Sequence, residues 1–256
     1  MVSAVAESHP RIKARREALH RDGERRKWLR TGALLLLLAV PIGVLALART
    51  SVLDVDRVAI EGASRADAAT LESLVGIDDG IALVDVDLAG VERRIERHPW
   101  VADATARRAW PDTLEVSVTE RIPVAATPID GGSSWLLVDL DAMALDIVAR
   151  RPTSLPVVVG ADSLAAPGRR VADLDAAVLA VDALPQDLAQ WVLAVEQRAD
   201  RHVVLQLTDG VTADLGTADR LADKLVALAT LLTRVQTDCI ESFNVQAPDA
   251  PVVTRC

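Results

Sequence analysis

Residues able to carry out chemistry are few in this 256-residue chain. Beyond residue 48 it has two histidines, His98 and His202, and no GxSxG, HExxH, P-loop or SxxK motif. Paired carboxylates such as Asp85 and Asp87 are typical of solvated loops. An enzyme needs an acid, a base or a nucleophile that converge on one point. The sequence therefore favours a protein that is not an enzyme, with no cofactor and no small-molecule substrate.

The two cysteines, Cys239 and Cys256, lie near the C-terminus. Neither stands in a CxxC motif or near a histidine pair, so the sequence disfavours a zinc site. A disulfide between them would close a short loop and would persist outside the cytoplasm. Spacing alone does not define their geometry, so a disulfide and two free thiols both stay open.

An uncharged segment of eighteen residues, 31–48, lies between Arg30 and Arg49. As a helix it would be about 27 Å long, close to the roughly 30 Å hydrocarbon core of a bilayer. Pro41 and Gly43 are tolerated in membrane helices, where neighbouring groups satisfy the freed backbone. We therefore predict a transmembrane helix over residues 31–48.

The charges on the two sides of this segment differ in sign. Residues 1–30 hold nine basic and four acidic side chains, whereas residues 31–256 hold 19 basic and 33 acidic ones. Cytoplasmic flanks of membrane helices are enriched in Lys and Arg. We therefore predict a single-pass type II protein of the cell membrane, whose cytoplasmic basic tail, 1–30, touches the lipid bilayer. A nucleic-acid partner is disfavoured, because Trp28 is the only aromatic residue of the tail.

Two other interpretations of the apolar segment stay open. Ala46-Leu47-Ala48 has the small-x-small form of a signal-peptidase site, and a buried helix of a soluble protein would also be apolar. The thirty-residue N-terminal region and the long apolar core favour an uncleaved anchor over a cleaved signal.

Beyond the anchor, the period of the apolar residues changes in a regular order. Ser64 is a suitable N-cap for a first helix and Gly76 a suitable end. The β-α-α-β-β order over residues 52–123 predicts a three-stranded sheet covered on one face by two helices. The segments are a strand at 58–60, helices at 64–76 and 87–97, and strands at 100–108 and 113–120.

Residues 124–246 are richer in strand patterns, and residues 247–256 form a C-terminal tail. Asp209-Gly210, between two alternating segments, predicts a hairpin, and a leucine stripe after Thr217 predicts a helix packed on a core. The chain is thus predicted to be α+β, with a single-pass anchor, a small first domain and a distal mixed β-sheet domain with helices. The distal elements are strands at 135–138, 155–160, 202–207, 211–215 and 240–245, and helices at 171–184 and from 217.

Several short motifs accompany this order: His98-Pro99-Trp100-Val101, Arg108, Trp110-Pro111-Asp112-Thr113-Leu114 and Glu120-Arg121-Ile122-Pro123. In this order and spacing they resemble the POTRA domain of the FtsQ/DivIB cell division proteins, of the actinobacterial type. The likeness extends over residues 28–254. Proline ends helices and forms turns, and tryptophan supplies bulk to a core that is poor in Phe. We therefore interpret the motifs as markers of the fold. In one departure, the family often has a Gly in the turn 139–143, where this chain has Ala142 and Met143.

The resemblance implies a divisome scaffold needed for septum formation. It implies binding to FtsB and FtsL, further contacts with FtsK, FtsW and FtsI, and a location in the cell membrane at the division septum. Through its extracytoplasmic domains such a scaffold links early to late division proteins. Two alternatives stay open: a POTRA-bearing protein-transport component, and another anchored regulator of the envelope.

The resemblance also implies where a partner docks. In the family FtsB docks on the last strands of the distal domain, and an edge strand offers backbone hydrogen bonds to an added strand. Phe243, the only phenylalanine, is the best single contact candidate; the alternative is that it faces the core. By position, the implied contact residues are Ile240, Ser242, Phe243, Asn244, Val245 and Gln246.

Overall fold

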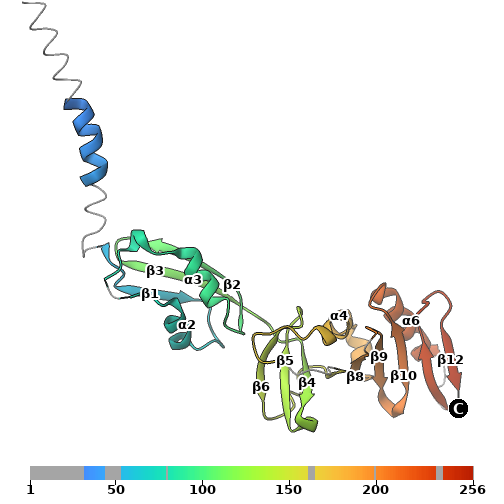
Figure 1. The fold of residues 1–256 in the computed structure, drawn as a ribbon. Coiled ribbons are helices and arrows are strands. Elements are labelled where there is room, and N and C mark those ends of the chain that lie inside the picture. Colours follow the sequence, from blue (N-terminus) through green and yellow to red (C-terminus); the bar gives the residue numbers. More distant parts are fainter. Residues whose placement is uncertain are drawn as a thin grey trace, which may run out of the picture. The chain divides into compact units, whose positions relative to one another are not determined.

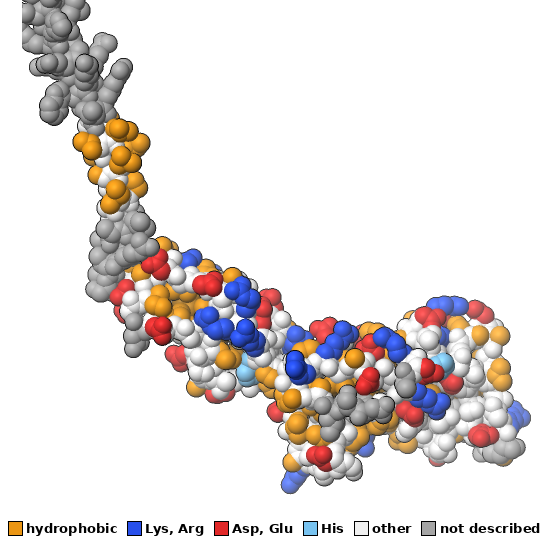
Figure 2. Space-filling view, in the orientation of Figure 1, with side chains coloured by type: hydrophobic (Ala, Val, Ile, Leu, Met, Phe, Trp, Pro, Cys, Tyr) orange, Lys and Arg blue, Asp and Glu red, His pale blue; other side chains and the backbone are white. Residues whose placement is uncertain are grey.

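The computed structural model describes residues 32–43, 53–78, 80–160, 165–198, 200–234 and 239–255 (Figure 1). Within these ranges no helix is both long enough and apolar enough to cross a membrane. Residues 32–43 form a helix with exposed leucines, Leu37 at 71%, and Figure 2 shows its apolar surface in orange. The tail at 1–30 and the rest of the predicted anchor, 31 and 44–48, lie outside the described residues.

Packing of the backbone divides the chain into two compact units that interleave along the sequence. The first combines the chain up to Arg57 with Ile77–Val86 and Arg108–Leu114. The second combines Val58–Gly76, Asp87–Arg107 and Glu115–Cys256. The domain boundaries predicted from the sequence, 52–123 and 124–246, stay predictions.

From Arg57 to Glu120 the strands and α-helices follow the predicted β-α-α-β-β order, with a short 3-10 helix at Leu83–Asp85 between the two helices (Figure 1). Their strands form one sheet in the order β1-β3-β2. Alternate residues of the central strand, Leu114, Val116 and Val118, are buried, as the period-two pattern predicts. The elements are β1 (Arg57–Glu61), α2 (Ala68–Val75), α3 (Leu88–Ile95), β2 (Val101–Ala109) and β3 (Thr113–Glu120).

Helix α2 begins one turn later than the sequence pattern predicts. Its N-cap is Asp67, whose carboxylate accepts a hydrogen bond from the Thr70 N–H at 3.0 Å, and Gly76 at φ +57° ends it. The prediction that Ser64 caps this helix is wrong, because the Ser64 hydroxyl donates to Glu120 on β3 at 2.6 Å. Both residue types are good caps, so the local sequence does not separate them.

The distal residues form two sheets that an isolated bridge connects. Their strand orders are β4-β5-β6 and β12-β11-β10-β9-β8-β7. The bridge is parallel and pairs Ala126 with Val157. The strands are β4 (Ala125–Ile129), β5 (Ser134–Val138), β6 (Ala144–Val148), β7 (Val158–Val159), β8 (Val192–Gln197), β9 (Val203–Leu207), β10 (Thr212–Gly216), β11 (Ile240–Asn244) and β12 (Val252–Arg255). The helices are α4 (Asp175–Asp182), α5 (Gln186–Ala189) and α6 (Leu221–Arg234).

The Asp209-Gly210 hairpin is confirmed: β9 and β10 pair antiparallel on either side of it. Asp209 and Gly210 have φ of +61° and +75°, values that Asp and Gly tolerate better than most residues. The predicted start of a helix at Thr217 is wrong, since α6 begins at Leu221. The Thr217 carbonyl instead accepts a hydrogen bond from the buried ammonium of Lys224 at 2.8 Å.

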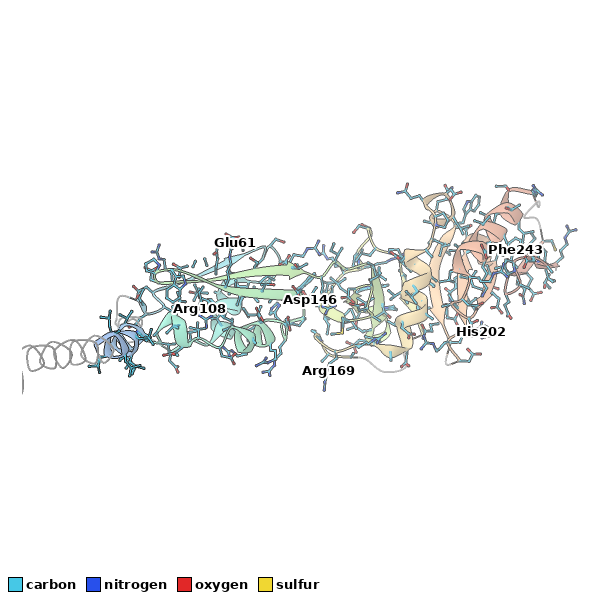
Figure 3. All side chains as sticks on the ribbon, turned by 90° about the horizontal axis from the view of Figure 1, so that it is seen from above. Glu61, Arg108, Asp146, Arg169, His202 and Phe243 are labelled. Atoms are coloured by element: carbon cyan, nitrogen blue, oxygen red, sulfur yellow. The ribbon has the colours of Figure 1, made fainter. Side chains whose placement is uncertain are left out.

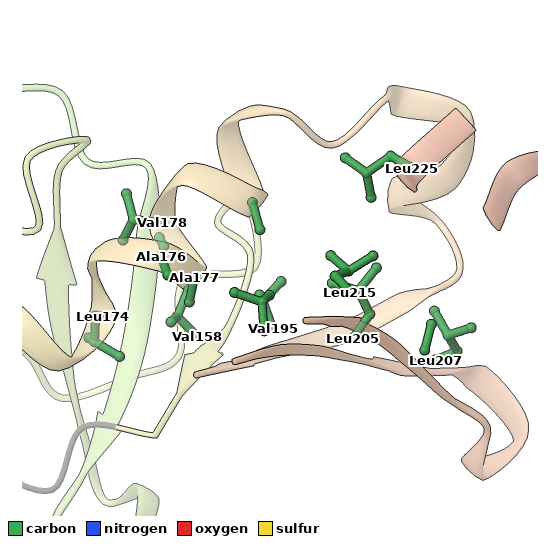
Figure 4. Packing of buried hydrophobic residues seen from close by; sticks show 14 of the residues in the cluster. Val158, Leu174, Ala176, Ala177, Val178, Val195, Leu205, Leu207, Leu215 and Leu225 are labelled. Carbon is green, nitrogen blue, oxygen red and sulfur yellow. The ribbon is translucent and has the colours of Figure 1, made fainter. Parts of the chain in front are cut away.

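Mostly aliphatic side chains fill the main core, to which the six-stranded sheet, the β4-β5-β6 sheet and the helices α4 and α6 all contribute. Figure 4 shows Ala177 of α4 above Val158, with Val195, Leu205 and Leu215 further along the sheet. A smaller cluster around Leu137 includes two tryptophans that pack against it. With one Phe and no Tyr in the chain, branched aliphatic residues supply the close packing that a core requires.

Candidate functional site

The marker residue Glu120, at the end of β3, binds the loop that precedes α2. Its carboxylate accepts hydrogen bonds from the Ser64 hydroxyl and from the backbone N–H groups of Ser64, Arg65 and Ala66, at 2.6 to 2.8 Å. Burial raises the pKa of Glu120, but these hydrogen bonds outweigh it and lower the pKa to about 2. The side chain therefore acts as a cap for a loop within the fold.

The next marker, Arg121, joins β2 to the turn between β5 and β6. Its Nε donates to the Val101 carbonyl at 3.1 Å, and its Nη1 donates to Asp139 at 2.6 Å and to Asp141 at 3.2 Å. Asp139 is 4% exposed and also accepts from the backbone N–H of Met143. This turn contains Ala142 at φ +56°.

Arg108, labelled in Figure 3, binds the segment between α2 and α3. Its guanidinium donates hydrogen bonds to the carbonyls of Leu83, Val84 and Val86 at 2.7 to 3.1 Å. His98, after α3, accepts a hydrogen bond from the Trp100 N–H at 3.3 Å.

The remaining markers lie at turns and in the small cluster. Pro99 follows α3, Trp100 packs on the cluster around Leu137, and Pro123 precedes β4. Trp110 and Pro111 occupy the β2–β3 turn, and Trp110 is 55% exposed. Most of the markers thus contact the fold itself, whereas Trp110 and Pro111 are exposed.

The implied partner strand, β11, lies inside the sheet. It pairs parallel with β10, where Ala213 lies opposite Phe243, and antiparallel with β12, where Val253 lies opposite Phe243. Strand β11 therefore has no open edge, and contact of residues 240–246 with a partner stays a prediction. The chain turns back after Gln246 and places β12 on the outer side of β11, a pairing that the local pattern does not reveal.

The side chains of this segment alternate between core and solvent. Ile240, Phe243 and Val245 are buried, and Phe243 is 1% exposed, so the alternative that it is a core residue is confirmed (Figure 3). Ser242 is half-buried, and Asn244 and Gln246 are exposed. The Gln246 side chain donates to Asp214 of β10 at 2.9 Å.

Beside β12 lies a groove of about 530 Å³ between α6 and the β11–β12 turn. Its walls mix exposed apolar side chains, such as Val226 at 62%, with charged ones. Arg220 binds Asp223 at 2.9 Å and Asp249 at 3.2 Å across it. The local sequence pattern does not reveal this groove, and Pro248 and Pro251, which line it, are its only signal in the sequence.

Candidate groups for chemistry do not converge in the part of the chain that the structure describes. No cluster of three potential metal ligands is found there. His98 follows α3, and His202, which precedes β9, contacts Asp200 at 3.1 Å. Cys239 is exposed, and Cys256 lies outside the described residues, so the predicted alternatives for this pair stay open. The arrangement offers binding surfaces.

Two protein-family models match the chain. One, described as POTRA domain, FtsQ-type, matches residues 53–121, and the other, described as Cell division protein FtsQ/DivIB, C-terminal, matches residues 129–246. Together they cover both folded regions of the chain.

Several curated relatives bear the name cell division protein FtsQ. That of Streptomyces bingchenggensis is 33% identical over 249 residues, which is 95% of this chain and 91% of the relative. That of Streptomyces venezuelae is 32% identical over 90% of this chain and 88% of the relative. That of Mycolicibacterium smegmatis is 31% identical over 89% of this chain, which spans 65% of the relative's length.

Proposed function

The chain belongs to the FtsQ/DivIB family of cell division proteins, and we propose that it is a bitopic scaffold of the division septum. In this proposal its extracytoplasmic domains bind FtsB and FtsL and thereby link early to late division proteins. The family assignment and the absence of a convergent catalytic group among the described residues both support a binding role.

The proposal includes an N-terminal anchor at residues 31–48. Exposed side chains support it, because Leu35, Leu36 and Leu37 in the described helix are each 66–71% exposed. Contiguous exposure of this kind marks a surface that contacts a membrane or another protein. The excess of basic residues before the segment supports a cytoplasmic N-terminal end in this proposal.

The open edge of β12 is the observation that carries the partner site. It ends the six-stranded sheet, so one side of its backbone has no strand partner within the described residues. An added strand gains main-chain hydrogen bonds at such an edge, and side chains in neighbouring pockets give specificity. Val253 of β12 packs on the main core, which anchors the edge in the distal domain. FtsB is the proposed occupant.

Proline substitutions test this site. Neighbouring N–H groups along a strand point to opposite sides, so one of Val253 and Thr254 directs its N–H away from β11. Proline at that residue keeps the β11–β12 ladder and removes a donor from the open edge. Of the two proline variants, the one with an unchanged Tm is the one that alters only the open edge. We expect it to bind FtsB about tenfold more weakly in a pull-down of the full chain from membranes. Alanine at the same position is the control and keeps binding.

Full FtsB binding by the proline variant with unchanged Tm rules out strand addition at β12. Localisation then separates the broader alternatives, since a fluorescent fusion of the full chain forms a midcell band if it acts in division. A uniform membrane signal would instead favour a transport component or another envelope regulator.

A further inference from the structure

A second surface lies away from β12, on the face of the β4-β5-β6 sheet that does not join the main core. The register pairs Trp135 with Val148, so these side chains and Leu137 share this face, whereas Leu136 belongs to the main core. A hollow of about 370 Å³ opens here. Its apolar floor and basic rim include Ile122, Leu137, Val148, Leu155, Arg65 and Arg150.

A neighbouring hollow of about 320 Å³ shares two lining residues, Ser154 and Leu155, with the first. It adds a third arginine, Arg151, and the exposed apolar side chain of Leu193. We refer to the two hollows together as the arginine groove. Two adjoining hollows suit an extended segment better than a compact ligand.

The arginine groove is positively charged in an otherwise acidic part of the chain. No Asp or Glu lines either hollow. Among the described residues, no ion pair joins Arg65, Arg150 or Arg151 to a carboxylate. After residue 30 the chain has 33 acidic and 19 basic residues, so three unpaired arginines at one groove stand out against their surroundings.

Two of these arginines are held in place by tryptophans. The Arg65 guanidinium carbon lies 5.3 Å from the ring centre of Trp100, and that of Arg151 lies 5.8 Å from Trp135. Stacking on an aromatic face orients a guanidinium and leaves its N–H groups available to a ligand. Arginine and tryptophan are also the residue types that dominate binding at protein interfaces.

The floor of the arginine groove is apolar and exposed to solvent. Ile122 is 75% exposed, the highest value among the large apolar side chains that the structure describes. A small anion would leave this side chain in water, whereas a peptide with aliphatic residues would cover it. We propose that the arginine groove binds an acidic, extended segment of a protein partner that also carries aliphatic side chains. This site is separate from the β12 edge.

Peptide display tests the proposal without a known partner. The full chain is immobilised in nanodiscs of zwitterionic lipid and screened against random 12-residue peptides. We expect the enriched peptides to combine Asp or Glu with Leu, Ile or Val. One enriched peptide is then synthesised and its affinity measured by fluorescence anisotropy. We expect the double variant Arg65→Glu/Arg150→Glu to bind it at least about tenfold more weakly than the wild type does. Binding by the wild type should weaken as the salt concentration rises.

Two variants sharpen the result. Arg169→Glu changes an exposed arginine that lines neither hollow and should bind the peptide as the wild type does (Figure 3). Ile122→Ser keeps every charge, removes an exposed side chain without disturbing the core, and should weaken the peptide severalfold. The proline variant of β12 should keep full peptide binding, which separates this site from the proposed FtsB site.

Several outcomes overturn the proposal. Enriched peptides without an acidic excess would do so, as would equal peptide binding by the wild type and Arg65→Glu/Arg150→Glu. Displacement of the peptide by phosphatidylglycerol vesicles, lost in the double variant, would assign the groove to lipid instead. Loss of peptide binding in the proline variant of β12 would show that the two surfaces are one site.

Discussion

Glu120 and Arg121 are neighbours in the sequence, yet they hold different parts of the fold. Glu120 accepts hydrogen bonds from the loop before α2, whereas Arg121 donates to Val101 and to Asp139. One dipeptide therefore joins β3 to a loop, to β2 and to the β5–β6 turn. These contacts give both motif residues a role in the fold.

Replacing Glu120 by Gln should destabilise the chain at neutral pH. The carboxylate accepts four hydrogen bonds, and the amide can accept fewer and carries no charge. We expect a loss of about 1–2 kcal/mol in the free energy of unfolding, the lower part of the range for charged hydrogen bonds because the site is partly solvated. Urea unfolding measures it, with Glu72→Gln on the exposed side of α2 as the control.

The same substitution should change the pH dependence of stability. Because the folded state lowers the pKa of Glu120 from 4.5 to about 2, its stabilising contribution is complete above the unfolded value. It is then lost as the pH falls from about 4.5 towards 2. The difference in unfolding free energy between wild type and Glu120→Gln should shrink across this range. A constant difference would contradict the assignment.

At the scale of the secondary-structure elements, two backbone segments can approach each other closely only where one of them has no side chain in the way. Gly160 follows β7 at φ +115°, and a Cβ there would lie 1.9 Å from the Gln197 carbonyl oxygen of β8. The Gln197 side chain in turn accepts hydrogen bonds from the N–H groups of Ala176 and Ala177 in α4. The β7–β8 contact therefore also orients α4 on the core.

Gly160→Ala should destabilise the distal domain by roughly 3 kcal/mol or more, since it adds a backbone clash to the cost of a positive φ. Gly131→Ala is a matched control, because Gly131 has φ +69° with open space around its Cβ position. The control should lose only about 1–2 kcal/mol. Thermal unfolding of both variants measures the difference, and equal losses would show that the clash is relieved by a small shift.

For the whole molecule, the proposed topology places both folded regions outside the cell. Cys239 is exposed and lies just before β11, so it reports the side of the membrane on which the distal domain lies. A membrane-impermeant maleimide should label Cys239 in intact, reduced spheroplasts of a Cys256→Ser variant. Labelling that requires lysis would show that the domain is cytoplasmic.

Some elements could be predicted from the local sequence pattern and others could not. Alternation in β3 and the Asp209-Gly210 turn predicted their strands correctly, because both signals act between residues close in the sequence. The helix start predicted at Ser64 is wrong because Glu120, 56 residues away on β3, binds this residue, whereas at Thr217 the carbonyl is bound by Lys224 of the helix that follows. Helix capping is thus decided partly by tertiary contacts.

By itself the sequence determined the order of elements in residues 52–123, the family resemblance and the apolar, asymmetrically charged N-terminal region. These depend on residue period, composition and motif order, which are properties of a linear chain. Only the tertiary structure decided that β12 covers β11, that Phe243 is buried, and that arginines from residues 65 to 151 border one groove. Pairing and burial depend on which distant segments meet, and a local pattern is compatible with several such arrangements.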